Sequence, residues 1–134
     1  MDSRYPRRNS APSALAAQNT TQRVYVDAEQ YFNVGFQVTY DASFAGTIKA
    51  YASMQTAQPD VSAALSQSNE YIAAATARID TAAVVSGATG YTIVAGSIGT
   101  IAASVQVDLA KWICIEVVRT AGTFDVTVMK SNNG

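Results

Sequence analysis

Three kinds of residue in this chain could do chemistry: one cysteine, a few carboxylates and a cluster of arginines. Cys114 lies inside an apolar run, and the 134-residue sequence contains no histidine. The Ser-His-Asp and Cys-His nucleophilic arrangements and the common zinc sites therefore have no basis here. We expect Cys114 to be a structural core thiol rather than a nucleophile. The sequence predicts no catalytic residue and no enzymatic activity.

The carboxylates that could work as a pair are Asp108, Glu116 and Asp125, which fall on or beside the C-terminal strands. A glycosidase needs two such groups facing each other in a cleft. Alternating carboxylates on a sheet are more often solvated surface groups or ion-pair partners, and we expect one of these two roles for each of the three.

Metal and phosphate sites lack the spacing that they require. Asp27, Glu29 and Asp41 could supply oxygen ligands to calcium, but no spaced Asp/Asn loop supports such a site. The stretch 87–90 has two glycines without the Lys-Ser/Thr ending of a phosphate-binding loop. We predict no metal site and no cofactor.

The arginines form the one electrostatic motif. Residues 1–22 are rich in small and polar residues, and four arginines against one aspartate give residues 1–23 a net charge of +3. We interpret 1–22 as an extended basic arm that docks on a neighbouring subunit. Binding to phosphates of packaged nucleic acid is the weaker alternative, and a disordered solubilising tail is the third. The predicted docking residues are Arg4, Tyr5, Arg7 and Arg8.

Tyrosines suggest a carbohydrate-binding alternative, because outward aromatic rings stack on sugars. Tyr31, Tyr51, Tyr71 and Tyr91 are spread over the body without forming a clustered platform. We expect most of them to pack at the core or its rim. Tyr51 and Tyr91 are the candidate glycan contacts.

The elements that must position these groups form one domain. Hydrophobic residues make up 49% and charged residues only 14%, against about a quarter charged in ordinary soluble domains. This low charge fits either an Ala-, Ser- and Thr-rich domain with a modest polar surface or a surface of which part packs on neighbours rather than facing water. No apolar run is long enough to predict a transmembrane helix, and the N-terminus does not resemble a signal peptide.

Alternation of apolar and polar residues predicts two β-hairpins. The first joins a strand over 31–40 to one over 46–54, and the second joins 112–119 to 124–130 through a short turn with Gly122. The strand over 112–119 is apolar on both faces except at Glu116, which predicts burial on both sides.

Shorter strands are expected over 23–27, 82–85, 91–94 and 104–109, whereas 59–80 is Ala-rich and fits either a helix or a loop with short strands. The predicted fold is all-β: an antiparallel β-sandwich or jelly-roll-like barrel over residues 23–134.

Two motifs carry a family resemblance: Gln37-Val38-Thr39-Tyr40 followed by GTIKAYAS, and Trp112-Ile113 followed by Arg119-Thr120, Gly122-Thr123 and Lys130. The chain resembles the small β-sandwich structural proteins of tailed phages and related viruses over about half its length. It departs from them at Cys114 and in its long Ala-rich middle.

The resemblance implies a virion component without enzymatic activity, such as a capsid decoration, minor capsid or spike protein. Its partners would be the major capsid protein and copies of itself, with a trimer as the working hypothesis. It would act in the virion and in the host cytoplasm during assembly. The alternatives are a glycan-binding or host-recognition module of a spike or tail fibre, and a small-virus coat protein whose arm holds the genome.

Overall fold

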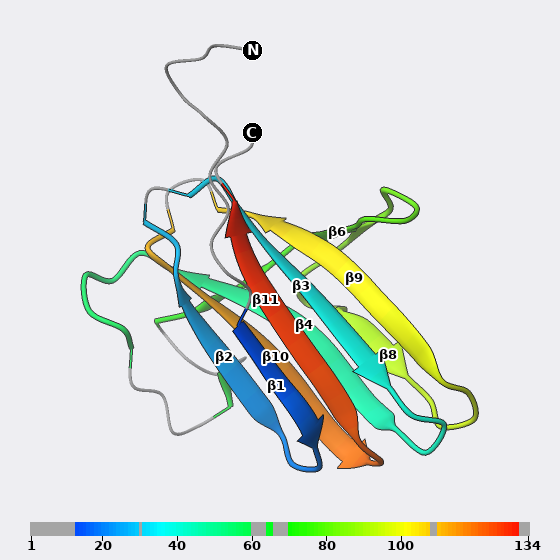
Figure 1. Cartoon of the computed structure of the whole chain (residues 1–134). Helices are drawn as coiled ribbons and strands as arrows, with labels where there is room; N and C mark the ends of the chain where they lie inside the picture. The colour runs from blue at the N-terminus through cyan, green and yellow to red at the C-terminus, as the bar shows by residue number, and fades with distance from the viewer. Residues whose placement is uncertain (1–12, 30, 60–63, 66–69, 108–109, 132–134) are drawn as a thin grey trace.

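The computed structural model describes residues 13–29, 31–59, 64–65, 70–107 and 110–131, and these build two antiparallel sheets packed face to face (Figure 1). The all-β sandwich that the sequence predicts is confirmed. Six strands form one sheet, in the order β1 (Ser13–Gln18), β11 (Phe124–Ser131), β3 (Asn33–Tyr40), β9 (Gly99–Gln106), β6 (Thr76–Arg78) and β7 (Val84–Val85). Five strands form the other, with β2 (Gln22–Asp27), β10 (Trp112–Ala121), β4 (Ala45–Ser53) and β5 (Ile72–Ala74) in order and β8 (Tyr91–Ile93) also pairing with β4.

The strands of both predicted hairpins exist, but the hairpin pairing is wrong. β3 lies in the six-stranded sheet and β4 in the five-stranded sheet, and β10 and β11 are divided in the same way. Each short turn therefore crosses the sandwich. Alternation and a Gly-containing turn are common to hairpins and to such crossings, so the sequence pattern could not separate them.

The core fills the space between the sheets. Phe36, Val38 and Val126 from the six-stranded sheet and Ile48 and Ile115 from the five-stranded sheet are all buried. Phe44, in the turn after β3, is completely buried and meets Phe124 edge-on at 5.5 Å between ring centroids. The predicted hairpin implies a turn between residues 40 and 46, and the sequence pattern did not indicate an aromatic core residue in it.

A second hydrophobic cluster covers the outer face of the five-stranded sheet. Tyr51 and Cys114 are buried there with Leu65 and Tyr71, and Trp112 packs against the group. The prediction that the strand over 112–119 is buried on both sides is confirmed for 113–117. Burial raises the pKa of the Cys114 thiol to about 12, consistent with the predicted structural role.

The described part of the Ala-rich middle contains strands rather than a helix. β5 and β6 occupy residues 72–74 and 76–78, so a helix continuing to residue 80 is wrong, while residues 60–63 and 66–69 lie outside the described residues. Ile72 and Ile79, which a helix would place near one face, are both exposed. Pairing of β5 with β4 and of β6 with β9 outweighed the helical spacing of a few apolar residues.

The sandwich also begins earlier than residue 23. β1 takes up residues 13–18 of the predicted arm and pairs with β11, and Leu15 packs against the core. Arg4, Tyr5, Arg7 and Arg8 lie outside the described residues. The boundary at residue 22 fails because an Ala-rich stretch with one leucine gives a weak strand signal.

Candidate functional site

The outer face of the six-stranded sheet is almost free of charge. Its central strands β11, β3 and β9 pair in continuous register, with Thr127 opposite Gln37 and Gln37 opposite Ala102. Among the outward positions that the structure describes on these three strands, Asp125 alone is charged. The outward residues are Gly35, Gln37, Thr39, Thr100, Ala102, Ser104, Gln106, Asp125, Thr127 and Met129.

A shallow hollow of about 190 Å³ lies on this face. It is lined by the small residues Gly35 and Ala102 and by the larger apolar side chains of Met129 and Ile79. Ile79 is 68% exposed, and its backbone N–H donates to the carbonyl of Ala102 at 3.0 Å. The face thus combines a small recess with an exposed apolar side chain at its edge.

Charge is found instead on the five-stranded sheet. Glu116 is 7% exposed and accepts a hydrogen bond from Arg23 Nε at 2.7 Å. The register places Arg23 on one side of Glu116 and Lys49 on the other. Glu116 thus lies between two cations on neighbouring strands, and this explains why the apolar run around it contains a carboxylate.

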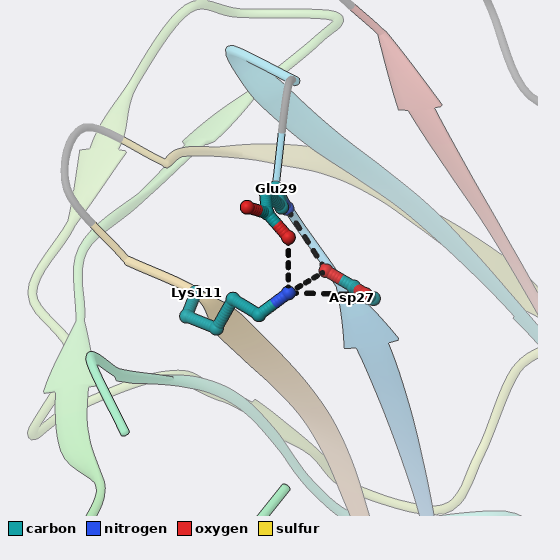
Figure 2. Close-up of polar contacts among 3 residues, drawn as sticks. All are labelled: Asp27, Glu29 and Lys111. Carbon is teal, nitrogen blue, oxygen red and sulfur yellow. Dashed lines mark hydrogen bonds and ion pairs between the residues drawn. The ribbon is translucent and has the colours of Figure 1, made fainter. Parts of the chain in front are cut away.

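A second ion-pair group joins the end of β2 to the start of β10 (Figure 2). Lys111 Nζ donates to Glu29 and, at 3.1 Å, to Asp27 Oδ1, which also accepts from the Glu29 backbone N–H. The backbone N–H of Glu29, followed by Lys111, lowers the pKa of Asp27, and the two carboxylates raise the pKa of Lys111. The ammonium group occupies the place between Asp27 and Glu29 where a calcium ion would have to sit.

The predicted carboxylates do not form a catalytic pair. Glu116 and Asp125 point outward from different sheets and so lie on opposite faces of the sandwich, and Asp108 lies outside the described residues. Within the described ranges, no three Cys, Asp or Glu side chains are grouped so that they could hold a metal ion.

Both candidate glycan contacts are buried, and the prediction for them is wrong. Tyr51 is 2% exposed in the second cluster, and Tyr91 is 7% exposed, with its hydroxyl accepting a hydrogen bond from Thr76 at 2.8 Å. Neither ring can stack on a sugar in this conformation. Tyr71 is buried as well, and Tyr31 lies under Lys130, whose Nζ is 4.8 Å from the ring centroid.

An opening of about 670 Å³ lies between the sheets, where Met54, Ile72 and Val84 surround small side chains such as Ala73 and Ala74. Its described lining contains no acidic or basic residue. Met54 is 73% exposed at this opening. The sequence gives no signal for the cavity, because its walls come from strands whose pairing the sequence does not fix.

The uncharged outer face was also only partly visible in the sequence. Alternation places Gln37 and Thr127 on the face opposite the apolar side chains of their strands, and the low overall charge is compatible with a surface that packs on neighbours. Locating that surface needed the strand order β11-β3-β9, which pairings between residues far apart in the chain determine.

No family model matches the chain, and no curated protein matches it in sequence. In the described residues, no helix is long and apolar enough to cross a membrane. Among solved structures, the chain is similar to the SPBc2 prophage-derived protein YomS, with a TM-score of 0.59 and 11% sequence identity over 91% of this chain and 96% of that one. At this identity the similarity concerns the fold. The chain therefore shares the β-sandwich fold of a prophage-derived protein.

Proposed function

We propose that this chain is a non-enzymatic structural subunit of a phage particle, a capsid decoration or minor capsid protein that binds the assembled shell and copies of itself. The fold shared with a prophage-derived protein supports the phage context. The partner would be the major capsid protein, and the protein would work in the virion without a cofactor.

The observation that carries the proposal is the outer face of β11, β3 and β9, where Asp125 alone is charged among the described outward positions. The cores of protein–protein interfaces are depleted of charged residues, because each buried charge must be desolvated or paired. The backbone N–H and C=O groups of central strands are already paired within the sheet. A partner therefore needs to be complementary only to the side chains of this face. Such a face suits repeated docking on a shell, where many weak contacts add up to avidity.

Glutamines on this face allow a nearly isosteric test. Gln37→Glu and Gln106→Glu add two carboxylates at exposed positions of the outer face, and Gln55→Glu adds one at an exposed position beyond β4. Burying unpaired charges in the contact should weaken binding to purified capsids by about tenfold or more. Gln55→Glu should bind as the unmodified chain does.

Co-sedimentation with capsids and, in parallel, with purified tails measures this effect. Equal capsid binding by the unmodified chain and by the doubly substituted face variant would contradict docking through this face. Binding to tails alone would contradict the capsid assignment. The basic arm, with Arg4, Arg7 and Arg8, is proposed as an additional contact to a neighbouring subunit.

A further inference from the structure

β1 is held by few side chains at the edge of its sheet. In the described structure it pairs with β11 alone, through Ala14 opposite Thr127 and Leu15 opposite Val126. Leu15 packs partly against the core, whereas Ala14 and Ala16 are exposed. An edge strand with so little burial belongs to the part of a fold that opens most readily.

β1 is strained near its end, and the connection that follows it is short. Ala17 has a φ of 52°, in the left-handed region, and the pairing with β11 shifts register between Leu15 and Gln18. Only residues 19–21 then separate β1 from β2, which lies in the opposite sheet. Short, strained hinges of this kind favour exchange of the element that they restrain, because extending the hinge relieves the strain.

The site left by an opened β1 would fit an identical strand. The edge of β11 would present unpaired backbone groups beside the buried side chains Val126 and Val128, with a space shaped for Leu15. The best match to this edge is the strand that occupies it within each chain. A second copy of the chain can supply that strand without any new contact having to form.

We propose that β1 is exchanged between two copies of this chain, so that each β1 pairs with β11 of the other copy in a two-fold dimer. Residues 17–21 extend in this dimer, and β1 and β2 become parts of one longer segment that crosses between the copies. The proposal goes beyond docking on a shell, because it concerns the free protein and uses the edge of β11 rather than the uncharged face.

Disulfide trapping tests the exchanged pairing. One chain carries Ala14→Cys and another carries Thr127→Cys; directly opposite residues of an antiparallel pair lie within disulfide range. The control replaces Thr127→Cys by Thr100→Cys, on the same face but two strands from β11. Buried Cys114 is present in all chains and is expected not to react. After mixing and oxidation, a cross-linked heterodimer should form with Thr127→Cys well above the control.

Two further variants link this pairing to self-association. A chain with both Ala14→Cys and Thr127→Cys, oxidised as a monomer, should stay monomeric at concentrations where its reduced form dimerises. Ala17→Gly removes the strain at positive φ in the closed monomer. It should therefore weaken dimerisation, lowering the association constant about fivefold for each exchanged strand.

Cross-linking no greater than in the control, undiminished dimerisation of the locked chain, or an unmodified chain that is monomeric at all concentrations would each overturn the exchange. Capsid binding of the locked monomer is measured separately. If the exchange fails but the locked monomer still binds capsids, the proposed shell-binding function stands. If the unmodified chain dimerises but the locked monomer does not bind capsids, the exchange stands and the proposed shell-binding function fails.

Discussion

Thr123 donates two hydrogen bonds to the carboxylate of Asp41, from its backbone N–H at 3.2 Å and from its hydroxyl at 2.8 Å. The Asp41 backbone N–H in turn donates to the Thr123 carbonyl at 3.2 Å. These residues belong to the two turns that cross between the sheets, after β3 and after β10. The contact therefore fixes both crossings at the same end of the sandwich.

Acid should weaken this contact. The Thr123 hydroxyl is the largest cause that holds the pKa of Asp41 below its usual value of 3.8, and Ser43 contributes. Because the folded-state pKa is the lower one, the stabilisation is complete above the unfolded-state pKa and is lost as pH falls through the folded-state pKa. We expect Asp41→Asn to lower the thermal unfolding midpoint by a few degrees at pH 7 and to reduce its dependence on pH below about 4.

Thermal unfolding followed by circular dichroism between about pH 7 and pH 2 checks this expectation. Thr123→Val is the matched variant, because it removes the hydroxyl and keeps the shape of the side chain. An Asp41→Asn chain that loses stability in acid as steeply as the unmodified chain would contradict the assigned role.

Gly122 is required at its turn for two physical reasons. Its φ is 76°, and a Cβ there would lie 2.3 Å from the backbone of Phe44. We expect Gly122→Ala to destabilise the fold by about 2 kcal/mol or more, from left-handed strain together with the backbone clash. Gly35→Ala is the control, since its Cβ would meet only ordinary contacts at 3.9 Å. Denaturant unfolding of both variants provides the comparison, and equal stabilities would contradict the packing of the two turns.

The sequence predicted the strands of this fold better than their partners. The alternation in 33–40 and 124–131 determines which side chains face the core, because a two-residue period fits only one burial pattern. Whether a short turn pairs its strands or crosses the sandwich depends on contacts such as those of Phe44 with Gly122, between residues far apart in the chain. Tyr51 shows the same limit, because its burial depends on Leu65 and Tyr71, which cover it.

The Arg23–Glu116 pair should show strong coupling in a double-mutant cycle. Arg23→Met would leave the carboxylate of Glu116, 9% exposed as a side chain, without its closest cation, at a cost of about 1–3 kcal/mol. Replacing both residues by methionine should recover much of that loss, because no charge is then left buried. Free energies of unfolding from the four chains give the coupling. Additive losses would mean that the ion pair contributes nothing.

Two deletions locate the start of the folded domain. Removing residues 1–12 leaves every described strand in place, so the unfolding midpoint should stay unchanged. Removing residues 1–18 also deletes β1, with the Leu15 packing and the hydrogen bond from Ala17 N–H to Asp125 Oδ1. The midpoint should then fall by several degrees. Equal midpoints for the two deletions would show that β1 adds no stability.

Saturation of purified capsids with the unmodified full-length chain tests the proposed binding to the shell most directly. We predict saturable binding to assembled capsids at a fixed copy number per shell, and little binding to dissociated capsid subunits, which lack repeated neighbouring sites. Absence of binding to assembled capsids at concentrations well above those in an infected cell, with the chain folded and in native form, would contradict the proposed function.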